Sequence, residues 1–213
     1  MSFETNDTYN FIMNHIDKII YINLDKRTDR RLDMENEFRR LNIPPDKIIR
    51  LPAIVDEYPP AGCSLSHAAA LKMASDLHFK NVLILEDDFT FIADTQKVVS
   101  SLDHFFNSVT EWDAVLLTRN SGTRASYDSI IEVCLGSGNA AGYLVNQHLF
   151  ERLSNTIEES IGPLRNTHIH WVYAIDVVWR QYMSSDKWFN FVEPLGYQKP
   201  GYSDISNSFV NNT

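Results

Sequence analysis

The sequence has 213 residues, enough for one well-buried α/β domain and too few for two full cores. A hydrophobic content of 44% and a charged content of 22% exclude intrinsic disorder as the state of the whole chain. A net charge of −9 argues against a nucleic-acid backbone as the main partner, because such binding depends on basic surfaces. We therefore expect a single domain over residues 1–213 that does not bind nucleic acid.

Cysteine content and hydropathy bear on the compartment. Cys63 and Cys134 are too few to form a disulfide framework, which favours a reducing environment. The N-terminal residues lack the basic and apolar regions of a signal peptide, and no apolar run approaches the roughly 20 residues that span a membrane. We expect a cytoplasmic protein without a transmembrane segment, and peripheral membrane association stays open.

The first half of the chain alternates between strand and helix patterns. Apolar, β-branched runs predict buried strands, while apolar residues at a spacing of three to four predict amphipathic helices. Prolines and glycines mark the loops. In chain order, we predict a strand at 19–24, a helix within 25–41 that Pro44 terminates, a short apolar segment at 47–51, a loop at 53–62, a helix at 64–79 and a strand at 82–85.

The second half is less regular. We predict strands at 114–117 and 130–135, a turn at 136–139, an apolar segment at 140–145, a helix at 147–157, a buried helix at 171–183, a further apolar segment at 188–192 and a polar tail. A helix is favoured over a strand at 171–183 because the segment exceeds the usual strand length. Together the elements predict a three-layer α/β domain with a mostly parallel, mixed sheet, in which ligands bind beyond the carboxyl ends of the strands.

The acidic triplet Glu86, Asp87 and Asp88 directly follows the apolar strand at 82–85. Three adjacent carboxylates repel one another, and a divalent cation offsets that repulsion. Mg²⁺ and Mn²⁺ prefer oxygen ligands and commonly bridge one or two carboxylates to substrate phosphates. The triplet therefore predicts a metal and phosphate site, with a solvent-facing acidic turn as the alternative.

A basic cluster follows the first strand and comprises Lys26, Arg27, Arg30 and Arg31. Arg27 and Arg31 are four residues apart near a helix start, where guanidinium groups and backbone N–H groups suit phosphate oxygens. The alternative is a solvated helix face on which these arginines pair with neighbouring acids.

Four segments, in this order along the chain, resemble glycosyltransferase family 25, which includes lipooligosaccharide sugar transferases and collagen galactosyltransferases. They are IIYINLDKRTDRR at 19–31, AGCSLSHAAALK at 61–72, VLILEDDF at 82–89 and GNAAGYLVNQHLFERL at 138–153, with weaker matches in AIDVVW at 174–179 and EPLGYQKPGYSDIS at 193–206. The resemblance implies a glycosyltransferase A-type fold. It also implies metal-dependent, inverting transfer of a hexose, galactose or glucose favoured, from a UDP-sugar to a hydroxyl of a glycan or protein.

The resemblance also suggests roles for particular residues. Asp88 is expected to contact Mn²⁺ or Mg²⁺ directly, with Glu86 as a further ligand and His170 as a possible completion of the metal shell. Asp87 would assist at the donor and in catalysis, and Asp176, an acid in an apolar stretch, would be the general base. The remaining residues expected at the donor are Asn23, Leu24, Arg27, Arg31, Ser66, His67, Gln198 and Ser203.

Several of these residues have structural alternatives. Ser66 also suits a helix N-cap, and His67 a packed, hydrogen-bonded position. Asp176 also suits a salt bridge to Arg165 or Arg180, and Cys63 is interpreted as a small buried side chain. The closing segment, with Gln198, Ser203 and Asp204, is expected either to fold over the donor as a lid or to fray as a terminus.

At the level of the chain, residues from about 15 to 110 are expected to bind the nucleotide sugar, 111–206 to face the acceptor, and 207–213 to form a tail. Two other functions stay open: an inactive nucleotide-sugar-binding domain, and another phosphate-handling α/β enzyme such as a nucleotidyltransferase. No P-loop pattern occurs in the sequence, which removes one branch of the second alternative.

Overall fold

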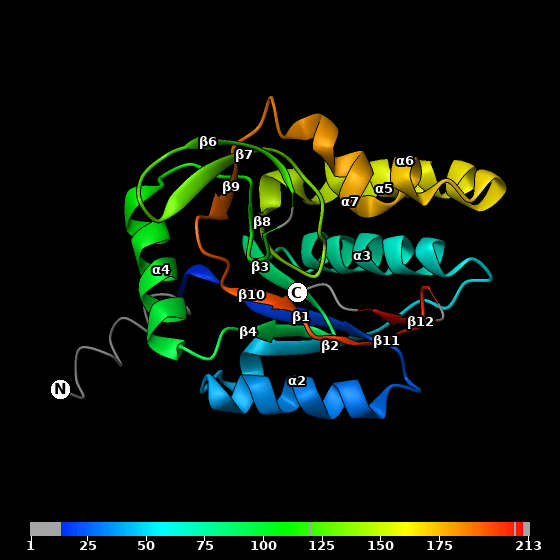
Figure 1. Cartoon of the computed structure of the whole chain (residues 1–213), viewed down its shortest axis with the longest axis horizontal. Helices are drawn as coiled ribbons and strands as arrows, with labels where there is room; N and C mark the ends of the chain where they lie inside the picture. Colours follow the sequence, from blue (N-terminus) through cyan, green and yellow to red (C-terminus); the bar gives the residue numbers. More distant parts are fainter. Residues whose placement is uncertain (1–13, 120, 207, 211–213) are drawn as a thin grey trace.

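A mixed eight-stranded sheet runs through the molecule (Figure 1). The computed structural model describes residues 14–119, 121–206 and 208–210. The strands lie in the spatial order β2 (Ile48–Pro52), β1 (Lys18–Asn23), β3 (Asn81–Glu86), β8 (Gly142–Asn146), β5 (Ala114–Leu116), β9 (Trp188–Phe191), β7 (Ile131–Ser137) and β6 (Gly122–Ser126). β1 pairs in parallel with both β2 and β3, whereas β8 joins the two parts of the sheet through antiparallel pairing with β3 and β5.

Helices cover both faces of this sheet, which confirms the predicted three-layer α/β fold with a mixed sheet. Helices α2 (Thr28–Arg40) and α4 (Thr95–Ser108) pack on one face, where Phe38 and Phe105 belong to the same apolar cluster. Helices α3 (Pro59–Asp76) and α5 (Gln147–Thr167) pack on the other, where Leu71 and Leu153 belong to a second cluster. Each face of the sheet is therefore covered by its own apolar cluster.

The alternation of β1 explains its near-continuous apolar sequence. Ile19 and Tyr21 point into the core beneath α2, while Ile20 and Ile22 point into the core beneath α3. Successive side chains of a strand face opposite sides, so a strand with helices on both faces needs apolar residues at every position. Asn23, at the end of β1, is the first polar residue after the apolar run and is 1% exposed.

A buried aromatic ring, that of Phe89, follows the turn after β3. Phe89 begins β4 (Phe89–Phe91), which pairs with β10 (Gly196–Gln198), and its side chain is fully buried. A Cβ atom would come within 2.5 Å of that ring at Gly142 and within 2.1 Å at Gly196, so both positions require glycine. Asp87 and Asp88, which form the turn between β3 and β4, directly precede this ring in the chain.

The end of the described chain returns to the carboxyl ends of β1 and β3. Strand β11 (Gly201–Ser203) pairs with β12 (Ser208–Val210) in a small hairpin that lies beside the start of α2 (Figure 1). We call residues 201–206 the strap. The strap brings the C-terminal part of the sequence against its N-terminal part.

Helix α3 begins earlier than predicted. Residues 59–62, expected in a loop, form its first turn, because the fixed φ of proline suits the first helical positions. The predicted N-cap role of Ser66 is therefore wrong: its hydroxyl donates to the Gly62 carbonyl at 2.7 Å and accepts the Ile54 N–H at 2.8 Å. Ser66 thus joins the helix to the loop at 53–57.

The predicted single buried helix at 171–183 is also wrong. The segment forms three short pieces, α6 (His170–Tyr173), α7 (Ile175–Val178) and the 3₁₀ helix η2 (Trp179–Tyr182), and the extended backbone of Ala174 separates the first two. Trp171 is 65% exposed whereas Trp179 is fully buried. Hydrophobicity suggested one buried element because it does not report where the backbone turns.

Other boundaries also differ from the predictions. Helix α5 continues to Thr167, past Pro163, so the predicted end at residue 157 is too early. The sequence patterns did not indicate α4 or β6. No helix in the described part of the chain combines the length and the apolar character that a membrane crossing requires.

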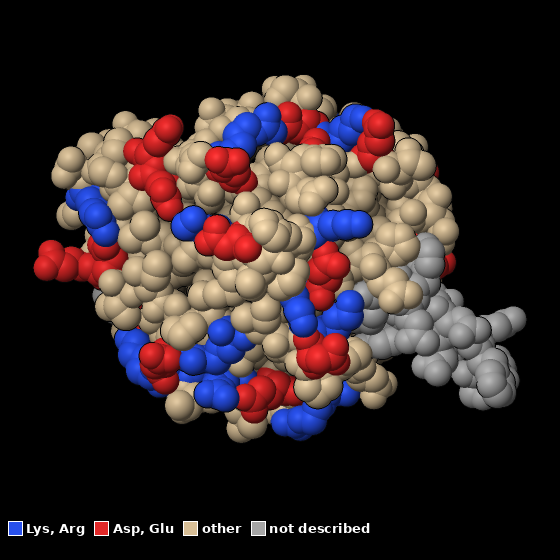
Figure 2. All heavy atoms as spheres, turned by 180° about the vertical axis from the view of Figure 1, so that it is seen from behind, with Lys and Arg blue, Asp and Glu red and all other residues tan. Residues whose placement is uncertain are grey.

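Charged side chains of both signs are interspersed over the face shown in Figure 2. They are densest along its lower edge, where α2 lies in the view of Figure 1. On this helix Arg31 pairs with Glu35, Arg40 pairs with Glu37, and Asp33 pairs with Lys199. Interspersed charges of this kind are typical of a solvated helix face rather than a binding patch of one sign.

Candidate active site

The acidic triplet lies where β1 and β3 end side by side. Glu86 is the last residue of β3, and Asn23, the last residue of β1, donates from Nδ2 to Asp87 Oδ2 at 2.7 Å. Arg30 donates to Asp87 Oδ1 at 2.8 Å and pairs with Asp88 Oδ2 at 3.0 Å. Both oxygens of Asp87 are therefore occupied, which makes this residue an anchor of the site.

Asp88 differs from Asp87 in having one oxygen left over. Its Oδ1 is buried and has no hydrogen-bond partner. Burial and the charge of Glu86 raise the pKa of Asp88 to about 7. Burial also raises the pKa of Asp87, although Arg30 and Asn23 oppose the shift. A buried carboxylate with an orphaned oxygen is a position that a cation can stabilise.

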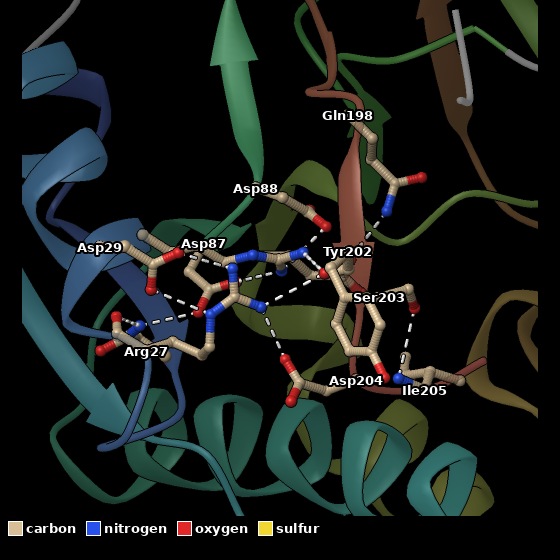
Figure 3. A network of polar contacts seen from close by, with 12 residues as sticks. Arg27, Asp29, Asp87, Asp88, Gln198, Tyr202, Ser203, Asp204 and Ile205 are labelled. Carbon is tan, nitrogen blue, oxygen red and sulfur yellow. Dashed lines mark hydrogen bonds and ion pairs between the residues drawn. The ribbon is translucent and has the colours of Figure 1, made fainter. Parts of the chain in front are cut away.

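The basic cluster links the triplet to the strap (Figure 3). Lys26 and Arg27 pair with Asp204 at 2.6 and 2.7 Å, and Arg30 donates to the carbonyl oxygen of Tyr202 at 2.9 Å. Arg30 thus contacts the triplet and the strap together. The described part of the strap lies folded against the site.

The sequence did not distinguish the arginine that faces the site. Arg31 is 51% exposed at its side chain and pairs with Glu35, so the structure does not bring it to the triplet. Arg30 occupies that place instead. Helix α2 begins at Thr28, so Arg27 precedes it, and consecutive residues such as Arg30 and Arg31 point about 100° apart on a helix.

Two cavities adjoin the triplet, and both lie in the size range of ligand sites. The first, which we call the triplet cavity, has a volume of about 420 Å³. It is lined by Ile22, Leu24, Lys26, Arg30, residues 53–56, Pro59, Cys63, Ser66, His67, residues 86–88, Gln198, residues 203–205 and Val210. It combines carboxylates, two cations and an apolar wall.

The second, which we call the Asp176 cavity, has a volume of about 480 Å³. It is lined by Tyr58, Pro60, Cys63, Ser64, Glu86, Asn139, Ala140, His170, residues 174–176, Gln198, Ile205 and Ser206. Cys63, Glu86, Gln198 and Ile205 line both cavities, so the two meet at these four side chains.

The residues proposed from the sequence divide between these places. Those in the triplet cavity are Leu24, Ser66, His67, Asp87, Asp88, Ser203 and Asp204; those in the Asp176 cavity are His170 and Asp176; and Glu86 and Gln198 line both. Asn23, Arg27 and Arg31 line neither cavity. Asn23 instead donates a hydrogen bond to Asp87, and Arg27 forms an ion pair with Asp204.

Three side chains from two other segments, α3 and β10, contact Glu86. His67 Nε2 lies 3.2 Å and Cys63 Sγ 3.6 Å from its Oε1, and Gln198 donates to its Oε2 at 3.1 Å. Burial raises the pKa of Glu86, but the hydrogen bonds and charges of His67, Cys63 and Arg30 together outweigh burial, so the net shift is downward.

Asp176 is the acid of the second cavity. Burial raises its pKa, the charge of Glu86 adds to the shift, and Arg180 opposes it. Arg180 donates its Nε to the backbone carbonyl of Asp176 at 3.0 Å, and Arg165 pairs with Asp56. A half-buried acid with a raised pKa that faces a cavity fits the profile of a general base.

Metal-ligating groups converge at a different point from the one predicted. In the described ranges, one group of His, Cys, Asp or Glu residues brings its ligand atoms within 4.8 Å of one another: Cys63, His67 and Glu86. Asp88, Glu86 and His170, expected around one ion, do not converge in this way. The four-residue spacing of Cys63 and His67 on a helix was the sequence signal that could have indicated the group.

Neither a family model nor a curated protein matches the sequence. Among solved structures, a glycosyltransferase involved in the glycosylation of the major capsid of PBCV-1 aligns with 82% of this chain and 92% of its own, at 12% identity and a TM-score of 0.46. A mannose-1-phosphate geranyltransferase from Thermus thermophilus aligns with 83% of this chain and 73% of its own, at 12% identity and a TM-score of 0.45. These likenesses concern the fold, and the side chains of the two cavities are what bear on function.

Proposed function

We propose that this protein is a metal-dependent glycosyltransferase that transfers a hexose from a uridine diphosphate donor to a hydroxyl of a glycan or protein, with inversion. One observation carries the proposal. A cavity with cations and carboxylates meets a cavity with a half-buried acid, Asp176, and Glu86 and Gln198 line both. Such a junction suits a reaction in which a charged donor and a neutral acceptor approach one another.

The triplet cavity is the donor site in this proposal. Lys26 and Arg30 line it and supply the positive charge that a diphosphate needs, since guanidinium forks suit phosphate oxygens. Residues 53–55 form an apolar wall on which a nucleobase and ribose can pack. Arg30 would exchange part of its pairing with Asp87 and Asp88 for the phosphates.

The chemistry of the donor set fits Mn²⁺ or Mg²⁺. Asp88 would hold the ion through its orphaned Oδ1 and Glu86 would assist, because these cations keep several waters and need only one or two carboxylates. When bound, the ion stabilises charge on the departing diphosphate. His170 lines the other cavity and has no part in this set.

The Asp176 cavity is the acceptor site. The acceptor hydroxyl attacks the anomeric carbon from the side opposite the diphosphate, so the new glycosidic bond forms as the bond to UDP breaks, and the configuration inverts. Asp176 takes the hydroxyl proton, and its raised pKa makes it a stronger base than an exposed aspartate. Lys26 and Arg30 stabilise the UDP that leaves with the bonding electrons.

The proposal is tested by titrating UDP into the protein with and without Mn²⁺ and following thermal stability, then incubating it with UDP-galactose or UDP-glucose. We expect stabilisation by UDP that requires Mn²⁺, and slow hydrolysis of one donor. In Asp88→Asn, the thermal stabilisation by UDP that requires Mn²⁺ should be lost. Asp76→Asn, which alters an exposed acid on α3 far along the helix, should behave like the unaltered protein.

The outcomes separate the alternatives. Binding of UDP without any hydrolysis indicates a nucleotide-sugar-binding domain. Absence of stabilisation, or stabilisation that Asp88→Asn leaves unchanged, shows the donor-site assignment to be wrong.

A further inference from the structure

Three ligand atoms of different chemical kinds meet at the junction of the two cavities. Cys63 and His67 lie one turn apart on α3, and Glu86 ends β3. Glu86 Oε1 is 3.2 Å from His67 Nε2 and 3.6 Å from Cys63 Sγ. A thiol, an imidazole and a carboxylate therefore face a common point.

The distances from Glu86 Oε1 to Cys63 Sγ and His67 Nε2 match those between ligand atoms around a tetrahedral metal ion. Bond lengths of about 2.3 Å to sulfur, about 2.0 Å to nitrogen and about 2.1 Å to oxygen, in tetrahedral directions, put nitrogen and oxygen roughly 3.4 Å apart and sulfur and oxygen about 3.6 Å apart. The observed separations differ from these by little. The third pair, Cys63 and His67, also has its ligand atoms within 4.8 Å of each other.

Two further side chains orient the ligands. Tyr143, fully buried on β8, places its hydroxyl 3.1 Å from His67 Nδ1, and Gln198 donates to Glu86 Oε2 at 3.1 Å. Metal-binding histidines and carboxylates are usually held in this way through the atom that does not face the ion. Here the held atoms are Nδ1 and Oε2, which leaves Nε2 and Oε1 directed toward Cys63.

The surroundings favour a cation. The charges of Glu86, Asp176 and Asp88 all act on the Cys63 position. Arg30 is already engaged with Asp87, Asp88 and the strap. A divalent ion at the Cys63 position would offset the negative charge of Glu86, Asp88 and Asp176 there.

We propose that Cys63, His67 and Glu86 form a second metal site, which binds Zn²⁺ or a similar transition-metal ion. A thiolate and an imidazole select such ions over Mg²⁺. Because Cys63 and Glu86 line both cavities, the fourth coordination position faces their junction, as in zinc sites that keep one position for water or substrate. This site shares Glu86 with the cation position at Asp88, but its other two ligands, Cys63 and His67, lie outside that position, and it does not depend on the transferase assignment.

The test is a titration of the metal-stripped full chain with Co²⁺, which reports thiolate coordination by a charge-transfer absorption band. We expect one equivalent of Co²⁺ to give the band and Zn²⁺ to displace it. Cys63→Ser should abolish the band. The matched control is Cys134→Ser, since Cys134 is buried against Met183 elsewhere in the fold, and it should retain the band, as should Asp88→Asn.

A second measurement needs no variant at a ligand position that could disturb folding. In the unaltered protein, Zn²⁺ should protect Cys63 from alkylation, followed by mass spectrometry of the peptide that contains it. Tyr143→Phe should weaken Co²⁺ binding by about 10–100-fold, the usual effect of losing an orienting partner.

Absence of a thiolate band together with unprotected Cys63 would overturn the proposal. So would Co²⁺ binding that Cys63→Ser leaves intact and Asp88→Asn removes, which would place the ion on the triplet. Neither outcome affects the UDP titration, so failure of the metal site and failure of the transferase assignment can be told apart.

Discussion

The triplet cavity and the Asp176 cavity differ in how their polar groups are partnered. In the triplet cavity Arg30, Asp87 and Asp204 all have ion-pair partners before any ligand arrives, whereas one oxygen of Asp88 has no partner. In the Asp176 cavity the half-buried Asp176 has a raised pKa, and the nearby Arg180 donates to its backbone carbonyl. The difference suggests that one cavity is organised to exchange ion-pair partners with a charged ligand and the other to accept a proton.

The largest expected effect tests whether Asp176 accepts a proton in its cavity. Asp176→Asn should lower kcat for sugar transfer by about 10²–10⁴-fold, because the amide cannot accept the acceptor proton. The dissociation constant for UDP should stay unchanged, since Asp176 lies outside the triplet cavity. Steady-state transfer assays and calorimetric UDP titration measure the two quantities. Transfer at an unaltered rate would remove Asp176 from the mechanism.

A substitution at Gly138, which adjoins Asp176, tests whether sugar transfer depends on the position of Asp176 as well as on its charge. At Gly138 a Cβ atom would lie 2.6 Å from the backbone oxygen of Asp176 and 2.2 Å from the guanidinium of Arg180. Gly138→Ala should therefore displace the acid and reduce kcat by about 10²-fold, as small misplacements of catalytic groups do. Ser126→Ala on β6 is a suitable control, because that residue is exposed and far along the sheet. Equal activity of both variants would contradict the expected role of position.

Substitution of two adjacent arginines tests whether the triplet cavity exchanges ion-pair partners with a charged ligand. Arg30→Ala should weaken UDP binding by about 10–100-fold, the effect of losing hydrogen bonds to a charged group. It should also lower the free energy of unfolding by about 3 kcal/mol, because Asp87 would be left buried without its cation. Arg31→Ala, at the exposed position paired with Glu35, should change neither quantity. Calorimetry and urea denaturation measure both, and a reversed order of effects would show that Arg31 binds the donor.

The smallest expected effect is the pH dependence of the stabilisation that Asp204 gives the strap. Burial raises the pKa of Asp204, but Lys26 and Arg27 outweigh it, so the net pKa lies below its ordinary value of about 3.9. The stabilisation that Asp204 gives the strap is thus fully present above pH of about 4 and is lost as pH falls toward the lowered pKa. Hydrogen exchange at 201–206, corrected for intrinsic rates, should rise over that acid range. In Asp204→Asn, exchange should already be fast at neutral pH.

Much of the fold follows from local patterns in the sequence. The apolar run of β1 could be identified because a strand between two helical layers has no solvent-facing side. The place of Glu86 at the end of β3 followed from the same pattern. The breaks at 171–183 could not be predicted, because the burial of Trp179 and the exposure of Trp171 depend on elements distant in the sequence.

For the site, the order of residues shows which side-chain types are available: three adjacent carboxylates, a basic cluster and an acid within an apolar stretch. Which of them meet depends on the fold. In the structure Arg30 rather than Arg31 faces the triplet, both oxygens of Asp87 have partners, and one oxygen of Asp88 has none. Spacing alone does not encode this outcome, because side-chain direction and ion pairing depend on helix phase and on the return of the strap to the start of the chain.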